Sequence, residues 1–286
     1  MKHGDFTKLA KDYVNRPGYS KTVLTVIGKY AGMDRKDFRV ADIGAGTGKL
    51  TENLSEIGLS GCAVEPNDAM RAEGVNLFTG NSTFTWSAGS AENTGLPSDA
   101  FDWVLMGSSF HWTDYKKALK EFHRILKNGG FFTAIWNPRD IEGHPLHEKI
   151  EAMIYNELPN MNRISSGSKK NIGDIEDRLL STDYFDDLFF IEASHEERMS
   201  KERYMGIWRS VNDIQVQAGE KKFKEILHNI EEIIKSYDEI VVPYKSRAWT
   251  VKSRKRDCAF RGGNCKVIVY IIVRPQYIEN RYAKSA

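Results

Sequence analysis

The sequence of 286 residues predicts an α/β fold built on a doubly wound, mainly parallel sheet. Between residues 38 and 138, short apolar stretches alternate with stretches whose apolar residues recur at helical spacing. The segment VADIGAGTGKL (40–50) places a buried strand directly before a glycine-rich turn and a helix. These observations predict that ligands bind at the carboxyl ends of the parallel strands.

The core elements are each predicted from their apolar pattern. We expect strands at 38–43, 61–65, 83–87, 103–108 and 131–136, and helices at 48–57 and 113–127. The fourth of these strands, WVLMGS, is apolar on both faces, as interior strands of a parallel sheet are. Entry helices are expected within 6–31, interrupted at the turn residues Pro17 and Gly18.

After Asn137 the periodicity is weaker. We expect an exposed loop at 165–173, a strand at 189–199 and helices near 200–214 and 219–237. Two later stretches, 239–251 and 265–273, both read as strands, the second with mostly β-branched residues. The pattern leaves open which of the two joins the sheet.

The glycine-rich turn indicates the kind of nucleotide that binds there. Gly44, Gly46 and Gly48 are spaced G-x-G-x-G, whereas a dinucleotide site has its last glycine one position later. Asp42 would repel a phosphate but suits an ammonium group. Glu65, at the end of the second strand, can accept both ribose hydroxyls of a nucleoside. Together these residues favour S-adenosylmethionine over NAD.

Four stretches, in order, resemble class I S-adenosylmethionine-dependent methyltransferases: VADIGAGTG, AVEPNDAM, GSAENTGLPSDAFDWVLMGSSFHW and LKNGGFFTAIW. The resemblance extends over about 9–250 and is closest over 38–138, and it is most similar to the small-molecule branch that includes trans-aconitate methyltransferases. It implies a Rossmann-like sheet of about seven strands whose last pair is antiparallel, a helical cap, and S-adenosylmethionine as cofactor.

The resemblance also implies a division of the chain. The expected regions are an N-terminal helical lid (1–37), the cofactor-binding core (38–138), a cap and substrate region with remaining core elements (139–240), a final core strand (241–251) and a basic extension (252–286). Residues 251–286 carry nine Lys or Arg and two Asp or Glu. Members of the family would end near residue 252, so this extension departs from the pattern.

The resemblance assigns the cofactor to the strand ends and the loops that follow them. Met70 would pack on the adenine ring, the loop around Ala91 would reach its amino group, and the Ser108 carbonyl would accept from the ligand's amino group. The full expected set is Asp42, Gly44, Ala45, Gly46, Gly48, Glu65, Pro66, Met70, Ser90, Ala91, Glu92 and Ser108.

The acceptor is expected beside the cofactor, at the ends of the fourth and fifth strands and under the lid and cap. His111 is either a general base or an orienting and packing histidine, and geometry must decide between the two. Substrate-binding candidates are Tyr13, Tyr19, Trp112, Trp136, Asn137, Tyr204 and Trp208, and Arg16 is a further lid candidate. We expect no metal site, because His144 and His147 have no Cys or carboxylate in the pattern around them.

These residues predict an enzyme that transfers a methyl group to an O or N atom of a small molecule. A nucleic-acid methyltransferase or binder using the basic tail is the alternative, disfavoured because GSSF stands where base-amino methyltransferases carry D/N-P-P-Y. A non-catalytic S-adenosylmethionine-binding protein is a third reading. With three cysteines and no signal-peptide pattern or apolar run of membrane-spanning length, we expect a cytoplasmic protein without membrane contact.

Overall fold

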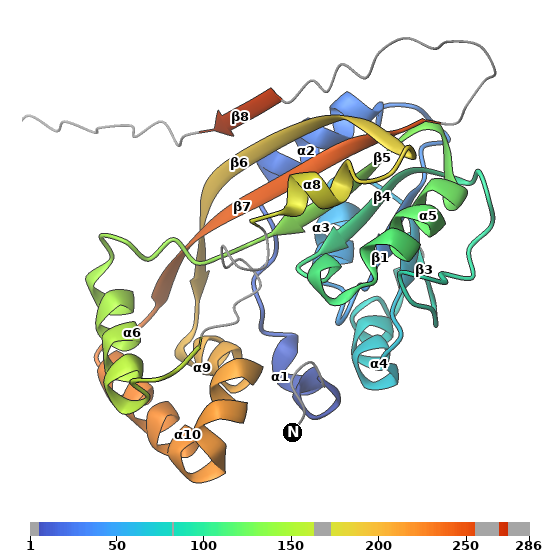
Figure 1. The fold of residues 1–286 in the computed structure, drawn as a ribbon. Coiled ribbons are helices and arrows are strands. Elements are labelled where there is room, and N and C mark those ends of the chain that lie inside the picture. The colour runs from blue at the N-terminus through green and yellow to red at the C-terminus, as the bar shows by residue number, and fades with distance from the viewer. Residues whose placement is uncertain (1–5, 82, 163–172, 255–268, 274–286) are drawn as a thin grey trace, which may run out of the picture.

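The computed structural model describes residues 6–81, 83–162, 173–254 and 269–273 (Figure 1). Its strands are β1 (Val40–Ile43), β2 (Gly61–Val64), β3 (Phe84–Ser87), β4 (Phe101–Gly107), β5 (Leu126–Trp136), β6 (Phe185–Met199), β7 (Ile240–Ser253) and β8 (Val269–Val273). They form one mixed sheet in the order β3-β2-β1-β4-β5-β7-β6-β8. The first five strands are parallel, β7 is antiparallel to both β5 and β6, and β8 lies parallel to β6.

The helices follow the chain as η1 (Thr7–Leu9), α1 (Ala10–Tyr13), α2 (Lys21–Ala31), α3 (Lys49–Glu56), α4 (Asp68–Leu77), η2 (Phe110–Trp112), α5 (Tyr115–Ile125), α6 (Pro145–Glu157), α8 (Ile175–Leu179), α9 (Lys201–Arg209) and α10 (Asn212–Ile234). Apolar side chains of α5 and α8 pack on one face of the sheet, and those of α2 and α3 pack on the other. The described residues therefore form the three layers of a doubly wound fold.

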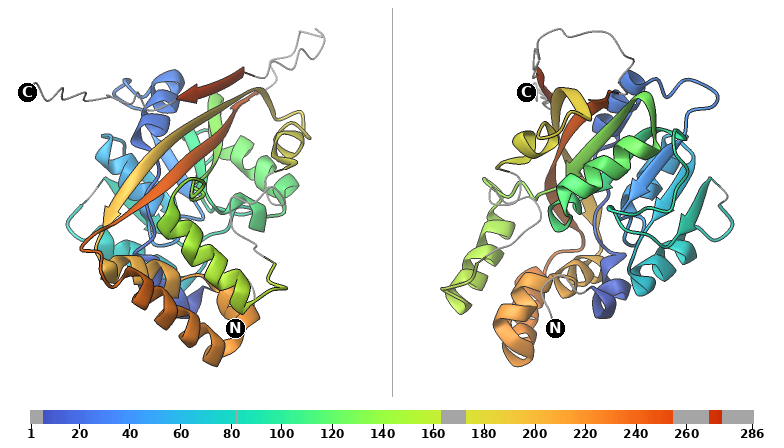
Figure 2. Two further views of the ribbon diagram at one scale, coloured as in Figure 1. Left: turned by 90° about the vertical axis from the view of Figure 1, so that its left-hand side faces the viewer. Right: turned by 45° about the vertical axis from the view of Figure 1, so that its right-hand side comes forward.

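A separate apolar cluster forms the cap. It joins α6, α9 and α10 to the ends of β6 and β7, which extend beyond the rest of the sheet (Figures 1 and 2). Met199, Ile240 and Val242 contribute the strand side of this cluster and are almost completely buried. The cap is thus carried on the two longest strands and lies at the carboxyl-terminal edge of the parallel strands.

The predicted α/β class and Rossmann-like sheet are confirmed, with the last pair of the expected seven strands antiparallel. The two competing stretches both join the sheet: β7 takes the antiparallel place between β5 and β6, and β8 adds an eighth strand at the edge. β7 continues to Ser253, so the core strand runs into the predicted extension. The rest of that extension and residues 165–172 of the predicted loop lie outside the described residues.

The helices of the cap differ in their boundaries from the prediction. The helix expected near 200–214 ends at Arg209, and the next begins at Asn212. Gly219, with φ of +73°, interrupts α10 in a conformation that glycine adopts without strain. Asn212 and Asp213, at the start of α10, line the candidate site, which is why this break matters.

Candidate functional site

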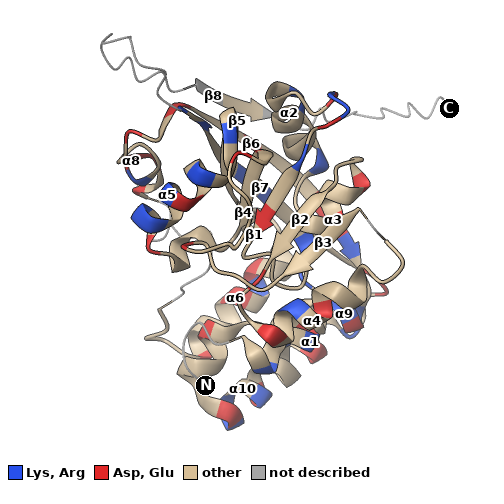
Figure 3. Ribbon diagram, turned by 90° about the vertical axis from the view of Figure 1, so that its right-hand side faces the viewer, with Lys and Arg blue, Asp and Glu red and all other residues tan. Residues whose placement is uncertain are grey.

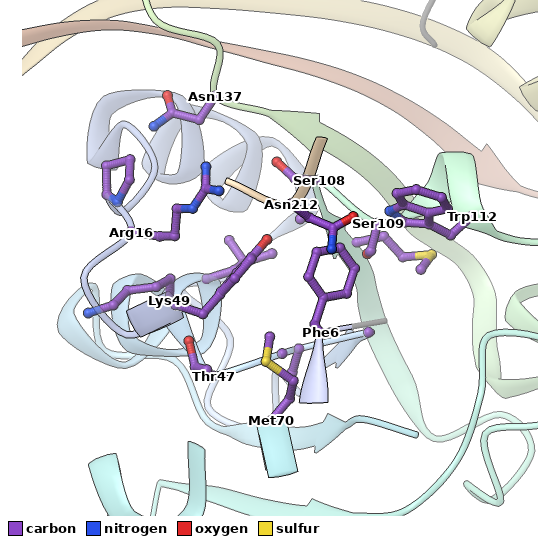
Figure 4. A pocket seen from close by; sticks show the side chains of 18 of the residues that line it. Phe6, Arg16, Thr47, Lys49, Met70, Ser108, Ser109, Trp112, Asn137 and Asn212 are labelled. Atoms are coloured by element: carbon purple, nitrogen blue, oxygen red, sulfur yellow. The ribbon is translucent and has the colours of Figure 1, made fainter. Parts of the chain in front are cut away.

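A cavity of about 840 Å³ opens where the carboxyl ends of β1, β4 and β5 face the cap and the N-terminal segment (Figure 4). Its lining includes Asp42, Glu65, Ser108 and His111 from the sheet side and Tyr204 and Trp208 from α9. This is the edge of the sheet at which ligands bind in doubly wound folds. The structure therefore brings the two predicted halves of the site into one space.

The glycine-rich turn borders the cavity through Gly44, Ala45 and Gly46. Gly44 and Gly46 have φ of +67° and +59°, a region in which a side chain is strained. A Cβ at Gly44 would also lie 2.9 Å from Oγ of Ser109. Backbone and ligand can therefore approach closely at this turn.

Gly48, also predicted as a cofactor contact, does not line the cavity. It precedes α3 with φ of +90°, and a Cβ there would lie 3.1 Å from the Trp86 ring. The third glycine of the motif thus permits the turn and the close packing at the start of α3.

Asp42 at the end of β1 is completely buried. Thr51 Oγ1 donates to its Oδ2 at 2.6 Å, while Oδ1 has no hydrogen-bond partner among the described residues. Burial raises the pKa of this carboxyl to about 7, a rise that the Thr51 hydrogen bond partly offsets and the nearby Glu65 charge increases. A buried carboxylate oxygen without a donor is costly, and an ammonium group in the cavity would satisfy it.

Glu65 follows β2 and is held by two backbone donors. Gly46 N–H donates to its Oε2 at 2.8 Å and Asn67 N–H donates to its Oε1 at 2.9 Å. Burial raises its pKa, while these hydrogen bonds and the nearby Arg71 act in the opposite direction. Pro66 and Met70, which is 4% exposed, line the cavity beside it. The carboxylate is therefore fixed in place, with further lone pairs available to accept from hydroxyl groups.

The loop after β3 reaches the cavity with Ser90, Ala91 and Glu92. Ser90 and Asn93 exchange backbone hydrogen bonds of 3.0 and 3.2 Å, which closes a tight turn around Ala91. Glu92 Oε1 accepts from Asp114 N–H at 2.9 Å, so this carboxylate also anchors the start of α5. The predicted adenine loop is therefore an ordered turn at the wall of the cavity.

Ser108, just past β4, has φ of +53°, an unusual conformation for a residue with a side chain. Its N–H donates to Ile135 O at 2.8 Å, and its hydroxyl accepts from the Tyr19 phenol at 3.0 Å. Strained backbone held by such contacts is common at functional sites. Here it sets the direction of the chain at the centre of the cavity.

His111 lies in η2 and lines the cavity, and its partner clarifies its role. Trp136 Nε1 donates to His111 Nδ1 at 3.4 Å, so the neutral ring carries its proton on Nε2. Trp136 itself is completely buried and does not line the cavity, because its ring packs against Trp249 in the core. Trp136 is thus a neighbour of the histidine rather than a direct substrate contact.

The N-terminal segment covers one side of the cavity. Phe6 makes edge contacts with Tyr13 and Trp112, and Arg16 lies over the Tyr13 ring at 5.1 Å. Arg16 donates to Ser210 Oγ at 2.7 Å and to Ser210 O at 2.9 Å, which ties the segment to the cap. The predicted lid residues Tyr13 and Tyr19 and the lid candidate Arg16 all line the cavity.

The cap end of the cavity is aromatic and contains a partly buried ion pair. Arg139 pairs with Glu151 and lies 4.5 Å above the Trp208 ring. Tyr204 contacts His147 Nδ1 through its hydroxyl at 3.2 Å, while His147 Nε2 contacts Val241 O at 2.8 Å. Tyr204 and Trp208, predicted to bind substrate, therefore line the cavity, whereas His147 makes its contacts within the cap.

Asn137 lines the cavity but its side chain is already engaged. Its amide donates to Gly18 O at 2.8 Å and accepts from Ser246 Oγ at 2.9 Å. It therefore holds the lid turn in place beside the acceptor space.

Several residues that line the cavity were not predicted from the sequence. They are Phe6, Thr47, Lys49, Asn67, Ser109, Arg139, Glu151, Tyr155, Asn212, Asp213 and Tyr244. Arg139 follows the predicted Asn137 by two positions, and Lys49 and Thr47 lie in the glycine motif, so proximity along the chain could have found these three. The cap residues depend on how α6, α9 and β7 meet, which no local pattern specifies.

Within 6–81, 83–162, 173–254 and 269–273, no group of three His, Cys, Asp or Glu side chains is arranged to hold a metal ion. Over the same residues, no helix combines the length and apolar character needed to cross a bilayer.

Known proteins match this chain over the region of the glycine turn and adenine loop. Residues 41–134 match the family model described as "Methyltransferase domain". An uncharacterized methyltransferase of Mycobacterium tuberculosis is 39% identical over 109 residues, which are 36% of this chain and 41% of that protein. One of Schizosaccharomyces pombe is 28% identical over 205 residues, which are 69% of this chain and 74% of that protein.

A solved structure extends the likeness to the whole fold. A candidate type II methyltransferase from Anaeromyxobacter dehalogenans superimposes with a TM-score of 0.61 at 19% identity, covering 84% of this chain and 99% of that one. At this identity the likeness concerns the fold. The chain spans about 41% of the length of the mycobacterial relative, and the matched residues 41–134 lie inside the predicted core. The predicted resemblance to methyltransferases is thereby confirmed over residues 41–134.

Proposed function

We propose that this protein is an S-adenosylmethionine-dependent methyltransferase that methylates an O or N atom of a small molecule in the cytoplasm. The observation that carries the proposal is the buried Asp42 carboxylate, whose Oδ1 lacks a donor, at the glycine turn of a methyltransferase domain. The same cavity continues past Ser108 and His111 to the cap, which leaves room for a second molecule.

The residues present fit this cofactor group by group. Asp42 would hold the ammonium end, Glu65 the ribose hydroxyls, and the turn around Ala91 with Met70 the adenine ring. S-adenosylmethionine carries no phosphate. This agrees with the two carboxylates near the glycine turn, because they would repel a phosphate there. When bound, the cofactor supplies an electrophilic methyl group on a sulfonium.

The acceptor space favours a molecule that carries a carboxylate. Arg16 lines the cavity, and its hydrogen-bond acceptors among the described residues are the two uncharged oxygens of Ser210. Nε and Nη2 make these two bonds, and the Nη1–Nη2 edge of the guanidinium can hold a carboxylate in two parallel hydrogen bonds. This property supports the relationship to the trans-aconitate methyltransferase branch that the sequence resembles.

This chain's own residues would position the acceptor rather than react with it. Arg16 would orient its carboxylate, and the His111 Nε2–H would donate to its polar atoms. The lid and cap would exclude water from the reacting atoms. Holding two reactants in line can lower the reaction barrier by about 7–11 kcal/mol in favourable cases. An acceptor atom that is already ionised has no proton to lose, so its methylation needs no base.

A nucleic-acid substrate is less well supported by the described surface. Acidic and basic residues occur together on the outer helices, including α4, α5 and α10 (Figure 3). A duplex-binding face would instead gather one sign of charge. The basic stretch after β7 lies mostly outside the described residues.

Calorimetric titration with S-adenosylhomocysteine, and with NADH in parallel, tests the cofactor assignment. We expect micromolar binding of the first and none of the second. Purified protein and S-adenosylmethionine are then offered aliphatic di- and tricarboxylates, phenols, amines and a DNA duplex, with methylated product as the readout. Binding without any product would indicate a non-catalytic protein, and preferred methylation of DNA would support the alternative.

A separate variant, with its control, tests the proposal that the acceptor carries a carboxylate. Arg16→Gln should abolish transfer to carboxylates and leave S-adenosylhomocysteine binding unchanged. Arg209→Gln is the matched control, because Arg209 joins the same two segments through Asp12 at 2.8 Å and does not line the cavity. Equal activity of the Arg16→Gln variant and the wild type would refute the carboxylate assignment.

A further inference from the structure

The connection between β3 and β4, residues 88–100, contains no helix. It nevertheless crosses from the edge of the sheet past β2 and β1, a path that in parallel sheets usually includes one. Its turn at Ser90–Asn93 borders the cavity. A loop of this length that must hold a ligand needs partners elsewhere in the chain to fix it.

Two residues one turn apart on α5 supply these partners. Glu121 Oε1 accepts from Thr94 N–H at 2.9 Å and from the Thr94 hydroxyl at 2.6 Å. Arg124 donates to Leu96 O at 2.8 Å and to Ser98 Oγ at 3.0 Å. The clasp, as we call Glu121 and Arg124, therefore holds the loop at three alternate residues.

The two residues of the clasp also bind each other. Arg124 Nε donates to Glu121 Oε2 at 2.8 Å and Nη2 donates to Oε1 at 2.7 Å, a forked geometry typical of strong arginine–carboxylate pairs. The Glu121 side chain is only 10% exposed and Thr94 is 1% exposed. Arg124 above all, with Thr94, lowers the pKa of Glu121 to about 2, so this carboxylate stays ionised.

Thr94 is directly coupled to the turn that lines the cavity. It follows Asn93, whose backbone is paired with Ser90, and a Cβ at Gly89 would lie 2.6 Å from Thr94 O. The two ends of the turn are therefore in contact with each other at Gly89 and Thr94. A displacement of Thr94 must displace the turn around Ala91.

We propose that Glu121 is a positioning residue for the adenine pocket. Through Thr94 it sets the place of the Ser90–Glu92 turn, although it does not itself line the cavity. The inference rests on the proposed function, since it assumes that this turn receives adenine. It predicts that affinity for the adenosine half of the cofactor depends on a carboxylate outside the site.

The experiment compares two ligands that share adenosine. S-adenosylhomocysteine carries the amino-acid end and 5′-methylthioadenosine lacks it, and both are titrated calorimetrically. Glu121→Ala should weaken the binding of both ligands by about tenfold or more. This is the loss of affinity expected when one hydrogen-bonded contact is misplaced. Asp42→Asn should weaken S-adenosylhomocysteine alone, because only the ammonium contact is lost.

Controls separate positioning from general damage. Glu232→Ala removes another i,i+3 ion pair, with Lys235 at the far end of α10, and should bind both ligands as the wild type does. Thr94→Val should reproduce the Glu121→Ala result and Thr94→Ser should restore binding, because serine keeps the hydroxyl. These two variants carry the test if Glu121→Ala fails to fold.

The two possible failures are distinguishable. A wild type that binds neither ligand would remove the proposed function and this inference together. A wild type that binds both, with Glu121→Ala and Thr94→Val unchanged toward 5′-methylthioadenosine, would overturn the inference alone. Faster amide exchange of residues 90–94 in the folded Glu121→Ala protein is the further expected result, and unchanged exchange there would count against it.

Discussion

The Tyr19 phenol donates a hydrogen bond of 3.0 Å to the Ser108 hydroxyl, so the N-terminal turn is joined to the end of β4. The same turn is fixed from three other directions. Tyr19 N–H donates to Asn53 at 2.6 Å, Asn137 donates to Gly18 O at 2.8 Å, and Ser20 N–H donates to Ser246 at 2.8 Å. The turn is thus a fixed part of the cavity wall.

Tyr19→Phe tests the contribution of this contact. Phenylalanine keeps the packing and removes the donor, so we expect the free energy of unfolding to fall by about 0.5–1.5 kcal/mol. S-adenosylhomocysteine should bind a few-fold more weakly, because Ser108 loses the contact that orients its hydroxyl. Chemical denaturation and calorimetry measure the two effects. Tyr30→Phe is the control, since that ring is 61% exposed on α2, and equal behaviour of the two variants would contradict the prediction.

Asp42→Asn should stabilise the protein in the absence of cofactor. The carboxyl has a pKa of about 7 in the folded protein and an ordinary value of 3.8, so the folded state binds more protons than the unfolded state between these values. Stability from this group is therefore present below pH 4 and lost as pH rises toward 7. At pH 8 the ionised group costs up to about 4 kcal/mol, which the neutral asparagine avoids.

Denaturation of the wild type and the Asp42→Asn variant at pH 5 and pH 8 measures this cost. We expect the variant to gain most at pH 8. Asp102→Asn is the contrasting control, because that buried carboxylate is paired with Arg35 at 2.7 Å and Lys127 at 2.8 Å and should lose stability on neutralisation. Destabilisation of the Asp42→Asn variant at pH 8 would show that Asp42 is structural.

Cofactor binding should release a proton from Asp42. An ammonium group stabilises the ionised carboxylate and lowers its pKa, so binding at pH 6 displaces the proton that the free protein holds. At pH 8 the group is already ionised and little is released. Titrations of S-adenosylhomocysteine in buffers with different ionisation enthalpies report the number of protons. Release approaching one at pH 6, absent from Asp42→Asn, is expected, and identical release by both proteins would exclude Asp42 as its source.

The sequence predicted those parts of the fold that depend on local pattern. Apolar runs and the glycine turn sufficed for β1 to β5, and the spacing of Gly44 and Gly46 with Asp42 sufficed for one wall of the cavity. These residues are near one another in the chain, so one motif specifies both the shape of the turn and the carboxylate beside it. The position of β8 beside β6 depends on pairing between segments far apart in the sequence. The local pattern therefore could not decide which of the two strand-like stretches joins the sheet.

The acceptor side could be predicted only in part for the same reason. Tyr204 and Trp208 were predicted because they are aromatic, whereas Arg139 and Glu151 form their pair only after α6 packs into the cap. Trp136 was misplaced because a residue at a strand end can face the core or the cavity, and its ring turns to Trp249. The motif does not specify which of its glycines borders the cavity, and Gly48 lies outside the lining.

His111 provides the last test, because its geometry favours donating over accepting a proton. With Trp136 Nε1 donating to Nδ1, the neutral ring should carry hydrogen on Nε2. Long-range proton–nitrogen NMR of labelled protein reads this tautomer directly, with the His111→Gln variant assigning the signal. Trp136→Phe removes the donor and should shift the ring toward a mixture of tautomers. Hydrogen on Nδ1 in the wild type would instead leave Nε2 free to act as a base, and acceptors that must lose a proton would then fit this site.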